Sequence, residues 1–221
     1  MKSNFVLFGL THWLILCSIP ATAWTLSRLG HSVVIRVILG AFLFLNELVY
    51  YGWKIQKGWF QFPAGLPLQL CDLIVWLTVI ACFTRNRWAF EFAFFTGLVG
   101  TSMAVLTPDL QQPWPSYNTI YFFLAHGGIV ATLLYLWWSG QARPQPGCLK
   151  RVMLVLNAYA MLLGAFNAFF GTNYMYLCRK PEAASLLDQL GPWPVYLLAG
   201  ELVALALFAV LWLPFRRSAA A

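Results

Sequence analysis

The sequence predicts an all-α integral membrane protein, a bundle of about seven transmembrane helices in a single domain of residues 1–221. Hydrophobic residues make up 61% of the chain and charged residues only 10%, and the mean hydropathy is +0.70. Soluble domains carry about 25% charged residues, so this composition excludes a water-soluble globule. Long apolar runs also recur along the whole chain, separated by short polar stretches.

The apolar runs are long enough to cross a hydrocarbon core about 30 Å thick, which takes about 20 helical residues. We expect helices at 5–26, 33–51, 66–83, 88–106, 120–138, 152–170 and 193–213. The first run lacks a small-residue cleavage site near its end, so we interpret it as a span and not a signal peptide. Prolines and glycines fall between the runs, as is typical of connections.

Basic residues predict the orientation of the bundle. One side holds nine of them: Arg28, Arg36, Arg85, Arg87, Arg143, Lys150, Arg151, Arg216 and Arg217. The other side holds five: Lys2, Lys54, Lys57, Arg179 and Lys180. Because cytoplasmic connections are enriched in Lys and Arg, we expect the N-terminus outside and the C-terminus in the cytoplasm. The net charge of +7 forms no continuous patch, which argues against nucleic acid as a partner.

Uncommon polar side chains gather in the outer halves of the expected helices. They are His12, Asn46, Glu47, Cys71, Asp72, Thr101, Ser102, His126, Asn167 and Glu201. Polar groups left without partners in lipid cost several kcal/mol each. We therefore expect a polar pocket that opens toward the outer face of the membrane, with Gln69 beside Cys71 and Asp72.

Four stretches carry a resemblance to a known family. They are Leu66 to Asp72 (LPLQLCD), Gly100 to Leu110, Phe122 to Gly127 (FFLAHG) and Gly171 to Pro194. Together they resemble the YwaF-like bacterial integral membrane proteins, relatives of a eukaryotic transmembrane acyltransferase that places polyunsaturated acyl chains on ether phospholipids. The resemblance covers nearly the whole chain and implies a multi-pass protein of the bacterial inner or plasma membrane.

The resemblance also implies a lipid-modifying enzyme with a cysteine nucleophile and a membrane histidine, which fall here on Cys71 and His126. Family members often carry histidine two positions before the cysteine, where this chain has Gln69. If that histidine is the base, this chain must use His126 or lack the activity. A cysteine suits acyl transfer because its thiolate is a strong nucleophile and forms a thioester.

Other interpretations of these residues are open at this stage. A membrane cysteine is often a small apolar filler, and His126 alone is often a packing residue. Cys178 is expected on the same outer face as Cys71, so the two thiols are candidates for a disulfide. Asp72 follows Cys71 by about 100° around a helix and is better placed to orient a neighbour.

The polar connection from Gly171 to Pro194 is a candidate for binding a lipid phosphate, because Arg and Lys pair well with phosphate oxygens. Its candidate ligands are Asn173, Tyr174, Tyr176, Arg179 and Lys180. The alternative is ordinary headgroup contact by basic residues at a membrane surface.

The leading hypothesis is a phospholipid acyltransferase or acyl hydrolase that needs no cofactor and takes membrane phospholipids or lysophospholipids as substrates. A second is a transporter or receptor-like binding protein in which Glu47, Asp72, His126 and Glu201 carry protons or contact a ligand. No inverted repeat supports transport. A third, a zinc hydrolase using His12, His126 and Asp72, is disfavoured because the chain has three histidines and no HExxH motif. The sequence sets no oligomeric state.

Overall fold

The computed structural model describes residues 5–110, 112–181 and 186–219, and the described chain is helical without strands. The helices are α1 (Leu10–Arg28), α2 (Val33–Gln56), α3 (Leu70–Thr84), α4 (Arg87–Thr96), α5 (Ser102–Leu106), α6 (Tyr117–Trp138), α7 (Cys148–Phe170) and α8 (Val195–Trp212). A π-helical turn, Gly97–Thr101, joins α4 to α5, and 3-10 segments lie at Tyr174–Tyr176, Leu186–Leu190 and Leu213–Ala219. The predicted all-α class is confirmed.

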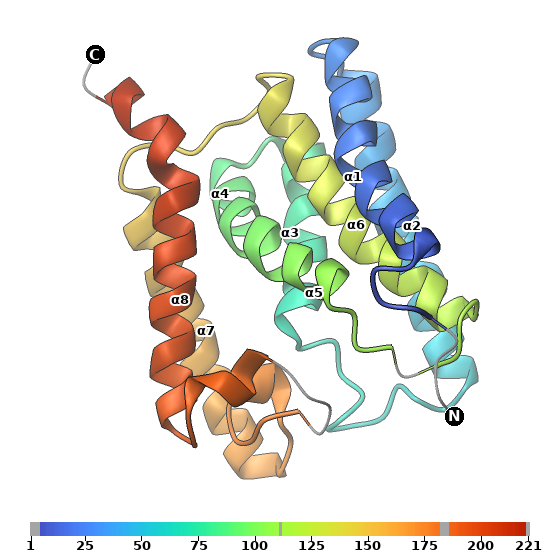
Figure 1. Ribbon diagram of the computed structural model, residues 1–221, viewed down its shortest axis with the longest axis vertical. Helices are drawn as coiled ribbons and strands as arrows, with labels where there is room; N and C mark the ends of the chain where they lie inside the picture. Colours follow the sequence, from blue (N-terminus) through green and yellow to red (C-terminus); the bar gives the residue numbers. More distant parts are fainter. Residues whose placement is uncertain (1–4, 111, 182–185, 220–221) are drawn as a thin grey trace.

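In the part of the chain that the structure describes, five helices are long and apolar enough to cross a membrane: α2, α4 with α5, α6, α7, and α8 with its extension to Arg216. α3 is apolar but has only 15 residues. The connections alternate between the two ends of the bundle, and the chain begins at one end and finishes at the other (Figure 1). The protein is therefore a multi-pass helical membrane protein.

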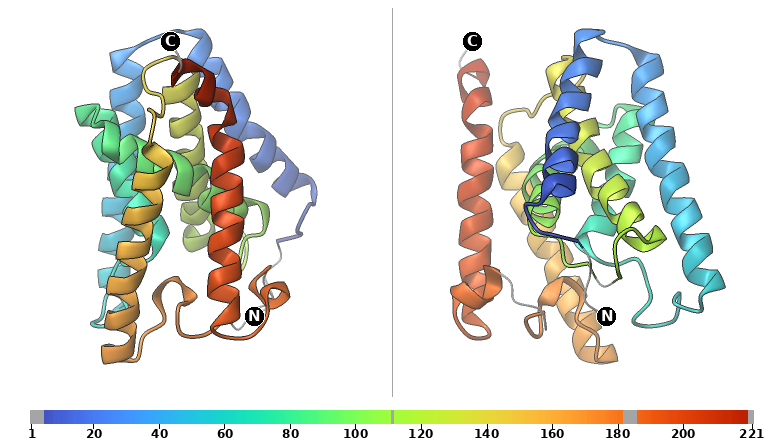
Figure 2. Two further views of the ribbon diagram at one scale, coloured as in Figure 1. Left: turned by 90° about the vertical axis from the view of Figure 1, so that its left-hand side faces the viewer. Right: turned by 45° about the vertical axis from the view of Figure 1, so that its right-hand side comes forward.

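The interior is formed by α4, α5 and α6, against which α1, α2 and α3 pack (Figures 1 and 2). In the apolar windows of the spans, 61% of residues are buried in α4–α5 and in α6, against 17% in α7 and 11% in α8. α7 and α8 stand to one side and leave most of their apolar surface for lipid (Figure 1).

The π-helical turn lies where α4 passes close to α6. A Cβ atom on Gly97 would lie 2.8 Å from Cδ1 of Leu133 on α6, closer than such atoms approach. Glycine is therefore required here for the two helices to pack. The hydroxyl of Thr101 donates to the Gly97 carbonyl at 2.5 Å, which satisfies a backbone acceptor inside the turn.

Several helix starts differ from those expected. The third helix begins at Leu70 and not at Leu66, because a residue before proline, here Leu66, is disfavoured in the helical region. The Asp72 carboxylate also caps the helix at this point, since it accepts from the Gln69 amide at 2.9 Å. The first begins at Leu10, after Gly9. The sixth expected helix, 152–170, corresponds to α7 and begins at Cys148, four residues before the expected start. The other predicted spans correspond to helices of similar extent.

Candidate functional site

A cavity of about 600 Å³ opens between α2, α3, α5 and α6, with the 3-10 segment Tyr174–Tyr176 at its edge. Its size lies within the roughly 300–1,000 Å³ usual for small-molecule sites. Sequence-predicted residues that line it are Glu47, Gln69, Cys71, Asp72, His126 and Tyr176. The rest of the wall is partly apolar, with Val75, Ala104, Leu110, Ala125 and Ile129 among its residues. The structure thus contains one polar pocket near the start of α3.

Cys71 is the second residue of α3 and faces this cavity as a half-buried free thiol. The first N–H groups of a helix lack intrahelical acceptors and carry the positive end of the helix dipole, so negative charge is stabilised there. All five cysteines are free thiols. The expected alternative of a Cys71–Cys178 disulfide therefore does not occur in this structure.

His126 reaches the cavity from α6 with one ring nitrogen already engaged. Its Nδ1 lies 2.8 Å from the carbonyl oxygen of Phe122, one turn earlier. Because a carbonyl only accepts, Nδ1 carries the proton and Nε2 keeps a lone pair. The ring also stacks on Phe122, with centroids 4.3 Å apart. Among the described residues no hydrogen bond joins His126 to Cys71, although both side chains line the cavity.

Gln69 and Asp72 organise the start of α3. Asp72 accepts from the Gln69 backbone N–H, and within the described chain its carboxylate forms no hydrogen bond with a histidine. The side-chain Oε1 of Gln69 accepts from the amide of Met175 at 3.0 Å. Gln69 thereby ties the Tyr174–Tyr176 segment to the helix that carries Cys71. Sequence reasoning assigned Asp72 to orient a neighbour, and the neighbour is its own helix terminus.

A buried acid lies in the wall formed by α2 and α6. Glu47 is 0% exposed, and its Oε1 accepts from the Tyr121 hydroxyl at 2.6 Å. The Tyr121 ring stacks on Tyr50 with centroids 3.5 Å apart. The second carboxyl oxygen of Glu47, Oε2, has no hydrogen-bond partner in the described chain. The acid is held by the Tyr121 phenol, and Tyr51 of its own helix also interacts with the carboxyl.

Sequence reasoning named Glu47 but missed Tyr50 and Tyr121. Tyr50 follows Glu47 by three residues and so shares its helix face, which was a usable signal. Tyr121 gave no such signal because its contact with Glu47 spans 74 residues. Thr107 and Asn118 also line the cavity and were not among the predicted site residues. Asp109 lines it as well, at the turn that the sequence offers as a candidate to close the pocket.

A comparison with family models matches the TMEM164 family over residues 3–212. The chain belongs to the TMEM164 family. Searches of curated proteins and of solved structures returned no match. Family membership and the long apolar helices agree on a multi-pass membrane protein. The narrower likeness to the YwaF-like bacterial proteins stays a prediction.

Six predicted pocket residues of this TMEM164-family chain do not line the cavity. His12 is buried between α1 and α5, where its Nε2 donates to the Val105 carbonyl at 2.8 Å and its Nδ1 accepts from the Phe8 amide at 3.0 Å. Glu201 lies exposed on α8 and accepts from Asn157 of α7 at 2.8 Å. The others are Asn46, Thr101, Ser102 and Asn167.

Asn167 has a structural role in the connection after α7. Its side-chain oxygen accepts from the Thr172 hydroxyl at 2.7 Å and from the Tyr174 amide at 2.9 Å. Its amide nitrogen donates to the Tyr174 carbonyl at 3.0 Å. The buried asparagine thus satisfies backbone groups of the loop and positions Tyr176 at the cavity. His12 and Asn167 therefore bond to backbone groups outside the cavity and do not line it.

The five predicted phosphate ligands do not converge. The Asn173 side chain accepts from the amides of Cys178 and Arg179 at 3.1 Å each, and the Tyr174 hydroxyl donates to the Pro63 carbonyl at 2.7 Å. Lys180 faces Asp188 at 3.8 Å, and Arg179 is exposed. Tyr176 alone reaches the cavity. Burial, with a smaller contribution from the charge of Asp109, raises the pKa of Tyr176, so its phenol is neutral near pH 7.

No group of three or more His, Cys, Asp or Glu side chains is arranged to hold a metal ion in the part of the chain that the structure describes. Of the three ligands weighed for zinc, His12 is engaged at the α1–α5 contact, while Asp72 and His126 line the cavity. The reactive groups that line the cavity therefore include the thiol of Cys71, the imidazole of His126 and the carboxyl of Asp72.

Proposed function

We propose that this chain is an intramembrane acyltransferase, or acyl hydrolase, that acts on phospholipids with Cys71 as nucleophile and His126 as general base. The observation that supports it most is that Cys71 and His126 line one cavity of about 600 Å³, with Nε2 of His126 unprotonated. The cavity walls combine these groups with apolar side chains that suit an acyl chain.

In the first step, Nε2 of His126 takes the proton of the Cys71 thiol. The thiolate attacks the carbonyl carbon of the phospholipid ester, and the C–O bond to the glycerol oxygen then breaks. The leaving oxygen takes the proton from His126 and departs as the lysophospholipid hydroxyl. The acyl chain stays on Cys71 as a thioester. The first-turn amides of α3 supply positive charge beside the sulfur.

In the second step, an acceptor hydroxyl gives its proton to His126 and attacks the thioester carbonyl. The C–S bond breaks, and the Cys71 thiolate leaves and regains the proton. A lysophospholipid acceptor makes the protein an acyltransferase, whereas water makes it an acyl hydrolase. Cys71 and His126 make no direct hydrogen bond in the described chain, so the substrate-bound state must bring them closer or place the ester between them.

The proposal also includes the orientation of the protein in the membrane. The cavity lies at the end of the bundle with fewer basic residues, so it opens to the outer face of a bacterial inner or plasma membrane, with the C-terminus in the cytoplasm. Residues 1–221 act as one transmembrane domain. The likeness to YwaF-like proteins and their acyltransferase relatives supports the same reaction class.

The test is lipid mass spectrometry on purified protein incubated with mixed phospholipids and lysophospholipids. Wild type is compared with Cys71→Ala, His126→Ala and the control Cys17→Ala, which removes an exposed thiol on α1. We expect acyl exchange in wild type and Cys17→Ala, and its loss in the other two. Free fatty acid in place of new phospholipid identifies the hydrolase. Exchange that persists in Cys71→Ala excludes the cysteine mechanism.

The free Oε2 of the buried Glu47 favours a second candidate, a transporter or receptor-like binding protein. An intramembrane acid beside a polar cavity is suited to carry a proton or contact a ligand. Proton-dependent uptake into vesicles that survives Cys71→Ala and is lost in Glu47→Gln supports this candidate. Acyl exchange without uptake leaves the first proposal standing.

A further inference from the structure

A second cavity lies at the opposite end of the bundle, between α2, the α3–α4 turn and the α6–α7 connection. Its volume is about 260 Å³, and four arginines line it: Arg36, Arg85, Arg87 and Arg143. No carboxylate lines it. The enrichment of Lys and Arg on the cytoplasmic side of a membrane protein does not require four arginines around one cavity.

Arg36 is the central observation, because it is a buried cation without an acidic partner. The residue is only 7% exposed, and its one described hydrogen bond is donated by an Nη atom to the Cys82 carbonyl. Its Nε is buried and has no hydrogen-bond partner in the described chain. Buried charges are normally paired, and a guanidinium offers five N–H donors. The unused donors of Arg36 therefore require an acceptor.

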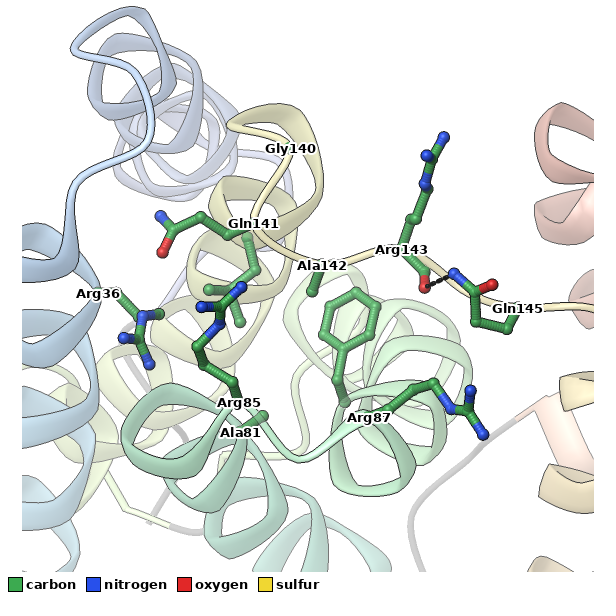
Figure 3. Close-up of a pocket in the computed structure, with 11 residues that line it drawn as sticks. Arg36, Ala81, Arg85, Arg87, Gly140, Gln141, Ala142, Arg143 and Gln145 are labelled. Carbon is green, nitrogen blue, oxygen red and sulfur yellow. Dashed lines mark hydrogen bonds between the residues drawn. The ribbon is translucent and has the colours of Figure 1, made fainter. Parts of the chain in front are cut away.

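Arg85 strengthens the case from the turn after α3. It adopts a left-handed conformation, φ 57°, which glycine occupies most readily at a helix end. In this conformation the Arg85 side chain lies over the cavity, where it approaches Arg36 (Figure 3). Figure 3 also shows that Arg87 and Arg143 extend away from this pair.

The nearest acid is already used. Glu91 of α4 accepts from Arg151 at 2.8 Å and from the Gln145 amide at 3.0 Å, and Arg87 lies 3.9 Å from it. Glu91 forms no ion pair with Arg36 or Arg85 in the part of the chain described. The charge of these two arginines is therefore uncompensated within the described residues.

Gln141 completes the site above the two arginines (Figure 3). Its amide nitrogen donates to the Tyr135 hydroxyl at 2.8 Å, while its Oε1 is buried without a partner. The cavity thus presents the unpaired Nε–H of the buried Arg36, the exposed guanidinium of Arg85 and one unpaired acceptor on Gln141. A phosphate group with a hydroxyl nearby satisfies all of them, since arginine pairs bidentately with phosphate oxygens.

We infer that this cavity is a binding site for a phosphate group, with Arg36 and Arg85 as its ligands and Gln141 as the acceptor for a hydroxyl. The site lies at the opposite end of the bundle from Cys71 and does not depend on acyl transfer. The phosphate belongs either to a phospholipid headgroup in the adjacent leaflet or to a solute, and the experiment separates these sources.

The experiment is isothermal titration of the full-length protein in an uncharged maltoside detergent. The probes are inorganic phosphate, a short-chain phosphatidylglycerol and a diacylglycerol with the same chains. We expect one or both phosphate compounds to bind and the diacylglycerol not to. Equal affinities for both identify the phosphate alone as ligand, and tighter binding of the lipid identifies the headgroup.

Variants make the result specific to the cavity. Arg85→Gln lies in an exposed turn and leaves the core intact, and Arg36→Gln removes the buried ligand. We expect each to weaken binding about 10- to 100-fold, as when a hydrogen bond to a charged group is lost. The control Arg28→Gln removes an exposed charge at the end of α1, at the same end of the bundle, and should change affinity by less than about twofold.

If Arg36→Gln does not fold, Arg85→Gln carries the test alone, with size-exclusion chromatography to show an intact protein. Equal losses in Arg85→Gln and Arg28→Gln overturn the inference, because they indicate general charge attraction. Absence of binding by both phosphate compounds at millimolar concentration overturns it as well, as does diacylglycerol binding as tightly as phosphatidylglycerol. Acyl exchange, measured separately, is expected to be unchanged in Arg85→Gln.

Discussion

The Nδ1 atom of His126 donates to the carbonyl oxygen of Phe122 at 2.8 Å, and this contact determines which ring nitrogen is available for chemistry. Because both groups lie on α6 one turn apart, the helix itself holds the tautomer. Nε2 remains an acceptor on a ring that lines the cavity. The base of the proposed reaction is therefore prepared by backbone geometry and needs no second side chain to orient it.

Replacing the imidazole tests this assignment. We expect His126→Gln to reduce acyl exchange by about 100-fold or more, since general-base catalysis contributes roughly 10²- to 10⁴-fold. The matched control is His31→Gln, which alters an exposed histidine between α1 and α2 and should leave the rate unchanged. Lipid mass spectrometry on the purified variants measures both rates. A rate for His126→Gln equal to wild type removes His126 from the mechanism.

The Tyr121–Glu47 pair tests how the cavity wall is held. Tyr121→Phe removes the hydroxyl that donates to Oε1 of the buried Glu47. We expect the free energy of unfolding to fall by about 1–3 kcal/mol. Tyr117→Phe, at a half-exposed ring on the same helix, should cost less than about 0.5 kcal/mol. Denaturant titration in detergent compares them, and equal losses contradict the structural role of the pair.

Asn167 provides a separate test of the loop that carries Tyr176. Asn167→Ala removes three hydrogen bonds to the segment from Thr172 to Tyr174. We expect hydrogen exchange at the Tyr174 and Met175 amides to accelerate by about tenfold or more, in line with the loss of about 1–3 kcal/mol of local stability. The control Asn157→Ala breaks contacts on α7 and with Glu201 instead. Unchanged loop exchange in Asn167→Ala contradicts the assigned role.

The spans could be predicted from sequence because each apolar run is long and is bounded by polar or proline-containing segments. The polar residues were harder to place. His12 and Asn167 look like pocket residues in sequence, yet each bonds to backbone groups whose positions depend on the tertiary fold, and His12 meets Val105 across 93 residues. Hydropathy identifies a polar group in a span but does not identify its partner.

The residues that line the two cavities also could be predicted only in part from the sequence. Cys71 and His126 were predicted to share a pocket, and they do line one cavity, but Tyr121 was absent from that prediction. Arg36 and Arg85 were counted only as topology signals. The buried position of Arg36 depends on how α2 packs against the end of α3, where its guanidinium reaches the Cys82 carbonyl, and no periodicity in the sequence reports that.

The final prediction concerns the attachment of α7 to the interior, because two arginines meet the same carboxylate in different environments. Glu91 accepts from Arg151 of α7 at 2.8 Å and lies 3.9 Å from Arg87 of its own helix. The Arg151 side chain is 28% exposed and the Arg87 side chain 53%. An exposed pair within one helix contributes about 0.3–0.5 kcal/mol, whereas a shorter hydrogen bond to a charged group contributes about 1.5–3 kcal/mol.

We therefore expect Arg151→Ala to lower the free energy of unfolding by about 2 kcal/mol and Arg87→Ala by less than about 0.5 kcal/mol, with the same change in net charge. Thermal unfolding in detergent ranks the two variants, and raised salt should weaken the smaller effect more because exposed pairs are screened. Equal destabilisation by the two substitutions shows that Glu91 does not join α7 to α4 through Arg151. A larger effect for Arg151→Ala means that this one ion pair stabilises a helix that otherwise faces mostly lipid.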